Sequence, residues 1–150
     1  MAIKDYYLWA ALCLLFIELI HFIYQRKLTD RRSKLFLLII FITILHCICG
    51  ISITVFLTQK MAAHPGNLII TTLLYLCQVL LPYLLFCLSW LTLPLPQRNT
   101  VLIRIASIPV FLGAIVSLTN PITGFIAHAE SDGLWHIGKG YPYFIYGLMI

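Results

Sequence analysis

Charged residues are scarce in this chain of 150 residues, and their scarcity excludes a soluble domain. Only 10% of the residues are charged, whereas 61% are hydrophobic. Soluble globular domains carry about 25% charged residues. The formal net charge of +5 does not indicate a nucleic-acid partner, because the basic residues flank apolar runs and do not form a patch. The composition therefore predicts an all-α integral membrane protein.

Motifs for catalysis and phosphate binding are also missing. The sequence contains no glycine-rich phosphate loop, no G-x-S-x-G and no H-E-x-x-H. None of the five cysteines lies in a loop, which argues against a disulfide framework. Cys47 and Cys49 would lie about 200° apart on a helix, so they cannot bind one ion together. We predict no catalytic residue, no cofactor and no metal site, and we expect the cysteines to pack in the core: Cys13, Cys47, Cys49, Cys77 and Cys87.

Apolar runs long enough to cross a bilayer, which takes about 20 helical residues, occur four times. A fifth run opens at Tyr141 and is cut off at Ile150. A helix cannot end inside lipid with its backbone groups unsatisfied. We therefore expect a bundle of at least five transmembrane helices, with residues 1–150 forming one N-terminal domain of a longer protein. The four complete spans are predicted at about Tyr6 to Tyr24, Leu35 to Thr58, Leu68 to Leu93 and Val101 to Thr119.

Basic residues are distributed unevenly between the two ends of these spans. The loops after the first and third spans hold seven Lys and Arg residues, including Arg98 and Arg104. The N-terminus, the loop after the second span and the segment after the fourth span hold one each: Lys4, Lys60 and Lys139. Basic loops stay in the cytoplasm. We predict a multi-pass protein of the bacterial cytoplasmic membrane with its N-terminus outside.

The segment from Asn120 to Tyr143 is too polar and too rich in glycine to lie in lipid. Pro121 is expected to end the fourth helix at Asn120, because proline disfavours the helical conformation of the preceding residue. Two β-prone runs then flank Glu130–Gly133, which predicts an extracytoplasmic β-hairpin-like loop between the fourth and fifth helices. With His64 this segment places three histidines outside, but their spacing matches no metal motif. The candidate ligand contacts here are Asn120, His128, Trp135 and His136.

Polar residues also occur inside the spans. Glu18 is the only carboxylate there, and His21 lies one turn away on the same predicted face. An ionised group in the membrane costs at least about 2.5 kcal/mol, so Glu18 should face protein, pair with another group or stay protonated. One interpretation is a proton relay or a polar ligand contact. The other is a packing device in which Glu18 bonds to His46 or Gln78.

Small and polar residues recur at helical spacing in every span, which is how membrane helices approach one another. This pattern predicts a compact bundle. The stripes are Ala11, Leu14, Glu18, His21 and Gln25 in the first span, Thr43, His46, Cys47, Gly50 and Thr54 in the second, Thr71, Tyr75, Gln78, Pro82 and Ser89 in the third, and Gly113, Ser117 and Asn120 in the fourth.

The stretch SLTNPITGFIAHAESDGLWHIGKGYPYFIYG resembles the region between the fourth and fifth helices of N-terminal multi-helix membrane sensor domains of Firmicutes diguanylate cyclases (GGDEF proteins). It is similar, more loosely, to seven-helix histidine-kinase sensor domains. That pattern has an aromatic residue followed by a basic one where this chain has Trp135-His136, which is a mild departure. The matching residues are Asn120, Pro121, Thr123, Gly124, Phe125, Asp132, Gly133, Gly138 and Tyr146.

The resemblance implies a sensory input module that relays an extracytoplasmic or intramembrane signal to a cytoplasmic cyclase or kinase domain. Its implied partners are the lipid bilayer, a small ligand or peptide, and a second copy of the chain in a homodimer, with no nucleic acid. A small transporter or membrane enzyme subunit using Glu18 and His21 is an alternative. A structural membrane anchor is another.

Overall fold

Four long helices account for most of the computed structural model, which describes residues 3–24, 30–59, 64–94, 100–129 and 135–142. The helices are α1 (Ile3–Tyr24), α2 (Arg31–Thr58), α3 (Pro65–Thr92) and α4 (Thr100–Thr123). Each is long and apolar enough to cross a membrane. The four predicted spans are therefore confirmed. The predicted fifth span opens at Tyr141, and from residue 143 onward it lies outside the described residues.

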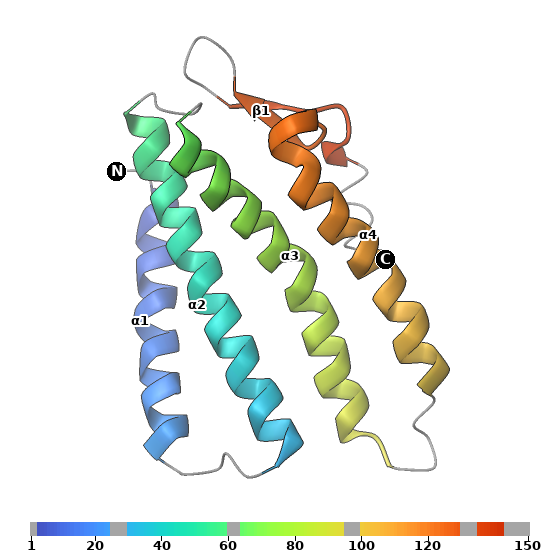
Figure 1. Cartoon of the computed structure of the whole chain (residues 1–150). Coiled ribbons are helices and arrows are strands. Elements are labelled where there is room, and N and C mark those ends of the chain that lie inside the picture. The colour runs from blue at the N-terminus through green and yellow to red at the C-terminus, as the bar shows by residue number, and fades with distance from the viewer. Residues whose placement is uncertain (1–2, 25–29, 60–63, 95–99, 130–134, 143–150) are drawn as a thin grey trace.

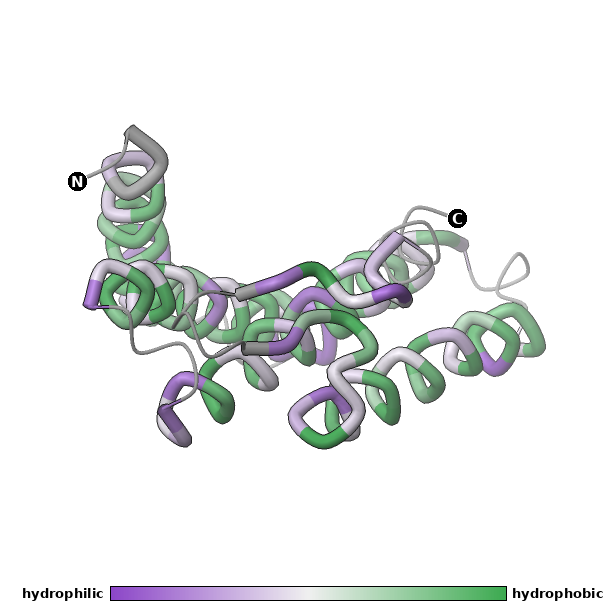
Figure 2. Tube along the Cα trace, turned by 90° about the horizontal axis from the view of Figure 1, so that it is seen from above, coloured by the Kyte–Doolittle hydropathy of each residue, from purple (hydrophilic) through white to green (hydrophobic). Residues whose placement is uncertain are grey.

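The helices follow one another in an open row (Figures 1 and 2). Extensive contacts join α1 to α2, α2 to α3, and α3 to α4, so each helix packs mainly on its neighbours in the sequence. The four described helices thus form a layer in which neighbours pack on one another, whereas the predicted compact bundle includes a fifth helix that lies outside the described residues. Small-residue spacing indicates that helices approach one another, but it does not determine whether the first and last helices meet.

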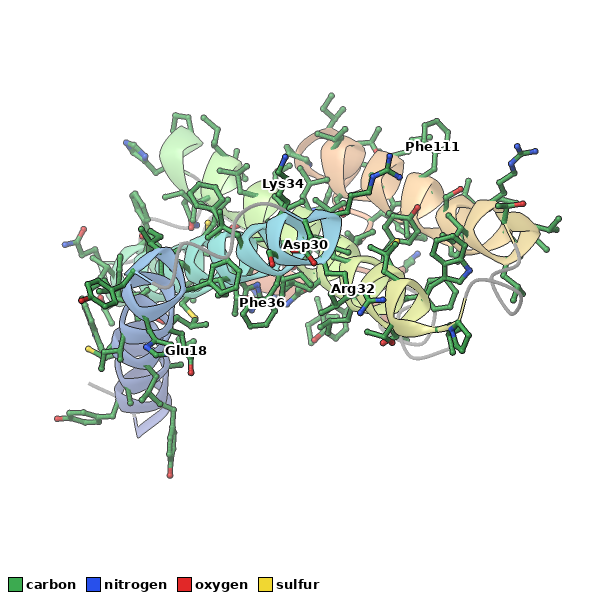
Figure 3. All side chains as sticks on the ribbon, turned by 90° about the horizontal axis from the view of Figure 1, so that it is seen from below. Glu18, Asp30, Arg32, Lys34, Phe36 and Phe111 are labelled. Carbon is green, nitrogen blue, oxygen red and sulfur yellow. The ribbon has the colours of Figure 1, made fainter. Side chains whose placement is uncertain are left out.

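The helix ends follow their local sequences. Asp30 caps α2 by accepting a hydrogen bond from the backbone N–H of Ser33 at 3.0 Å. Hydrogen bonds from the Ser33 side chain and backbone lower the pKa of the Asp30 carboxyl. Figure 3 shows Asp30 beside Arg32 and Lys34 at this end of α2. At the opposite end, His64 caps α3 through Nδ1, which accepts from the N–H of Gly66 at 3.1 Å.

The predicted end of the fourth helix is wrong, because α4 continues through Pro121 to Thr123. Proline in a last helical turn removes one backbone hydrogen bond without blocking the turns before it. The helix ends instead at Gly124, whose φ of +60° is left-handed. The N–H of Gly124 donates to the carbonyl of Asn120 at 2.8 Å, which is the αL helix-ending motif that glycine favours.

Two short strands follow α4 and lie across the top of the row in Figure 1. β1 (Ala127–Ala129) and β2 (Trp135–Ile137) are antiparallel, and His128 is paired with His136. The turn between them, residues 130–134, lies outside the described residues. We call β1 and β2 together the strand pair.

Buried side chains gather between α2, α3, α4 and the strand pair. Cys47, Cys49 and Cys77 are buried, which confirms core packing for these three cysteines, whereas Cys13 is exposed. Gly113 allows α4 to approach α3, because a Cβ there would lie 3.1 Å from the Val79 side chain.

Candidate functional site

The strand pair is attached to α4 by the side chain of Asn120, which is only 3% exposed. The amide oxygen accepts hydrogen bonds from the backbone N–H of Ile126 at 2.7 Å and of Ala127 at 3.2 Å. The amide nitrogen donates to the carbonyl of Ala127 at 3.1 Å. The Asn120 side chain thus bonds both backbone groups of Ala127, the first residue of β1, and the N–H of the residue just before it. These bonds give Asn120 an anchoring role. Its predicted ligand contact stays a prediction, because Asn120 also lines a hollow beside the strands.

The strand pair is attached to α3 by apolar packing. Ile126 is fully buried and forms a cluster with Tyr75 and Val79 of α3. Ala127 and Tyr141 pack against the same cluster. One short segment therefore joins the end of α4 to the outer half of α3.

The chain leaving β2 passes very close to the chain entering β1. The N–H of Gly138 donates to the carbonyl of Ile126 at 2.8 Å, and the N–H of Gly140 donates to that of Phe125 at 2.8 Å. A Cβ on Gly138 would overlap the carbonyl oxygens of Gly124 and Phe125. Only glycine fits at this crossing.

The two histidines of the strand pair are brought together, as their positions around the predicted turn suggested. His128 and His136 are directly opposed in the register, with ring centroids 6.0 Å apart. His128 is exposed and His136 is partly buried. The side chain of Trp135, the fourth predicted ligand contact, lies outside the described residues.

Two hollows flank the strand pair. One, of about 760 Å³, lies between the end of α4 and the strands and includes His128 and Lys139 in its lining. The other, of about 230 Å³, lies between α2, α3 and the strand pair and includes Thr71 and His136. Both hollows are thus formed partly by the strand pair.

The intramembrane candidates do not form one site in the described residues. Glu18 and His21 are exposed on α1, and Figure 3 shows Glu18 at the side of the row formed by α1. Leu14 of the same stripe is 64% exposed, so the predicted inward face of α1 is wrong. Periodicity shows which residues share a face, but not which way that face turns.

His46 and Gln78 are partly buried on α2 and α3, and Glu18 lies on neither helix. The imidazole of His46 lies near the backbone of Leu74 on α3. His46 thus lies against α3, and both groups are turned at least partly into the protein, as their stripes predicted. Pro82 and Ser89, further along the α3 stripe, are exposed.

No three His, Cys, Asp or Glu side chains lie close enough to hold one metal ion within the described part of the chain. His64 stacks on Phe56, with ring centroids 5.6 Å apart, while its Nδ1 caps α3. The Nδ1 atom of His64 is therefore already engaged in capping α3.

Sequence reasoning did not single out Ile126, and it named Gly138 without predicting the close crossing there, because both roles depend on two segments meeting in space. The only local signal was the concentration of glycines after the second β-prone run. Thr71 was placed in the inward stripe of the third span but was not identified as part of a binding site.

Comparison of the chain with protein-family models, with curated proteins and with solved structures gives no match. Its function therefore has to be inferred from its own residues and geometry.

Proposed function

We propose that residues 1–150 form a membrane-embedded sensory input module, with the strand pair as its signal-receiving element. The supporting observation is the double attachment of the strand pair. Asn120 bonds it to the end of α4, and Ile126 packs it on α3. Any displacement of the strand pair must therefore change the position of α3 or α4.

The opposite ends of these helices lie near basic residues. The seven Lys and Arg residues that predict the cytoplasmic side belong to the loop before α2, the first turns of α2, the segment joining α3 to α4 and the beginning of α4. In Figure 1 the strand pair lies beside the opposite ends of the helices, away from these basic residues. We place the strand pair outside the cell on this charge asymmetry.

The output in this proposal is a cytoplasmic diguanylate cyclase or histidine-kinase domain, as the resemblance of the Asn120–Tyr146 region implies. Lipid surrounds the row, and a second copy of the chain joins it through the membrane or the output domain. A ligand drives such a module only by binding one arrangement more tightly than the other. A coupling free energy of about 1–3 kcal/mol gives a roughly 5- to 150-fold response.

The transporter alternative receives no comparable support. Its central residue, Glu18, is exposed on the helix that contacts chiefly α2. Transport sites instead combine broken helices with polar groups turned into the protein. The described residues bring no second carboxylate to Glu18, because no other carboxylate lies inside a span.

Activity of the full-length protein in membranes tests the proposal. We expect Asn120→Ala and Ile126→Ala, which each loosen one attachment, to change basal cyclase or kinase activity at equal membrane content. Thr119→Ala is the matched control, because its exposed hydroxyl bonds only to carbonyls of its own helix. If replacement of residues 126–137 by a Gly/Ser linker leaves basal activity and stimulus response unchanged, the strand pair is only a connector.

Orientation is tested separately by cysteine labelling in a cysteine-free background. A cysteine at Ser131 should react with an impermeant reagent added outside, and a cysteine at Thr29 should not. The reverse pattern would invert the topology and place the strand pair in the cytoplasm.

A further inference from the structure

The smaller hollow beside the strand pair has the composition of a ligand site. Its volume is about 230 Å³, and its walls come from three elements. Among the described residues the walls are mainly aliphatic and contain no Asp, Glu, Lys or Arg, and their polar members are Thr71, Tyr75, His136 and Tyr141. Small-molecule sites are typically apolar, with a few placed polar groups. The aliphatic lining consists of Ile53 and Leu57 from α2, Leu74 from α3, and Ala127 and Ile137 from the strand pair.

One polar group in this lining lacks a hydrogen-bond partner. Thr71 is 5% exposed, and its buried hydroxyl has no partner among the described residues. Its neighbour Thr72 donates to the carbonyl of Leu68 at 2.9 Å, and Ser117 donates to that of Gly113 at 2.8 Å. A helical threonine normally satisfies its hydroxyl in this way. A buried hydroxyl without a partner carries a desolvation penalty that a bound polar group would remove.

From the cavity and this hydroxyl we propose that the hollow binds a small uncharged molecule with an apolar body and one hydrogen-bonding group, which bonds to Thr71. The volume sets the size of the ligand. An engineered apolar cavity of about 150 Å³ accommodates benzene, so the 230 Å³ of this hollow suits a substituted aromatic ring or a short-chain alcohol. A charged ligand is disfavoured, because the described lining residues include no Asp, Glu, Lys or Arg to offset its desolvation.

The position of the cavity suggests how binding reaches the rest of the molecule. A ligand there contacts α2, α3 and the strand pair together. Ala127 lines the cavity and also makes two hydrogen bonds with the Asn120 side chain, since its carbonyl accepts from the amide nitrogen and its N–H donates to the amide oxygen. The sensory meaning of such a ligand rests on the proposed function, whereas its binding does not.

A pair of fluorinated probes tests binding directly. 4-Fluorophenol carries one hydroxyl, and fluorobenzene has nearly the same shape without it. Their saturable binding to the chain in nanodiscs is measured by ¹⁹F NMR, with empty nanodiscs correcting for partition into lipid. We expect Thr71→Val to weaken the binding of 4-fluorophenol by about 2- to 12-fold, the contribution of one hydrogen bond. The affinity for fluorobenzene should not change.

Thr72→Val is the matched control, because the same substitution there removes a hydroxyl already satisfied within α3. It should leave the affinity for both probes unchanged. Ile53→Phe, which adds bulk to the cavity wall, should weaken the binding of both probes. Absence of saturable binding to the folded wild-type chain overturns the inference, as does an equal effect of Thr71→Val and Thr72→Val.

The outcomes separate this inference from the proposed function. Saturable, Thr71-dependent binding with no change in cyclase or kinase output would support the ligand site and contradict its sensory use. Loss of output in the attachment variants without probe binding would support the sensory module and contradict this ligand class.

Discussion

Removing the Asn120 side chain should detach the strand pair from α4. The Asn120→Ala change deletes all three side-chain hydrogen bonds, of 2.7, 3.2 and 3.1 Å. The N–H of Ile126 then loses its partner in a residue that is fully buried, at a cost of about 1–3 kcal/mol. Ala127 is only partly buried, so water offsets part of the loss of its two bonds, which together add about 1 kcal/mol.

The expected total is about 2–4 kcal/mol of local stability. Hydrogen exchange of the purified chain in nanodiscs measures it, because amides of a locally opening segment exchange in proportion to the open population. Peptides containing Ile126 and Ala127 should exchange roughly 30- to 900-fold faster, since each 1.4 kcal/mol is a factor of ten. Peptides from α2 should not change.

Two comparison variants sharpen this test. Thr119→Ala should leave exchange in β1 at the wild-type rate, because that hydroxyl bonds only within α4. Asn120→Asp keeps the acceptor for the two N–H groups but places an oxygen against the carbonyl of Ala127, so it should fall between wild type and Asn120→Ala. The anchoring role assigned to Asn120 is refuted if Asn120→Ala and Thr119→Ala give the same exchange rates.

Two further predictions concern the crossing after β2 and the cap of α2. Gly138→Ala should lower thermal stability strongly, because its Cβ would overlap the carbonyl of Gly124. Gly50→Ala should be tolerated, because the nearest contact of its Cβ would be an ordinary 3.5 Å. Equal melting temperatures for the two variants would contradict the close crossing. The lowered pKa of Asp30 means that its cap stabilises the fold above the ordinary value of 3.8 and is lost as the pH falls through and below it. Asp30→Asn, which retains a capping oxygen for Ser33 without titrating, should remove this part of the acid sensitivity in melting curves measured against pH.

The positions of the four helices could be predicted because membrane insertion depends on properties that are local in sequence. A run of about 20 apolar residues is sufficient to span lipid, and each predicted span overlaps one helix. The predicted end at Asn120 was wrong because it considered only the backbone preference of a residue before proline. The three bonds of the Asn120 side chain favour the helical position there, and they exist only once β1 has returned over α4.

The candidate site was predictable only in part, for a related reason. His128 and His136 lie symmetrically about a turn signal, so their proximity followed from local pairing rules. Ile126 and Thr71 are separated by more than fifty residues in the sequence, and each resembles an ordinary membrane residue by itself. The inward face of α1 could not be predicted from Glu18, because a carboxylate in a span suggests an inward face, whereas the side of α1 that contacts α2 includes Leu8 near Gly50.

The open row of helices has a consequence for biosynthesis. Since each helix packs mainly on the one made just before it, a nascent chain can acquire most of its contacts in the order of synthesis, and local contacts of this kind form quickly. The exception is the end of the described chain, where Ile126 must find Tyr75 and Val79 on a helix completed some thirty residues earlier. That closure is therefore expected as a late step of assembly, and it can begin only after α4 has left the ribosome.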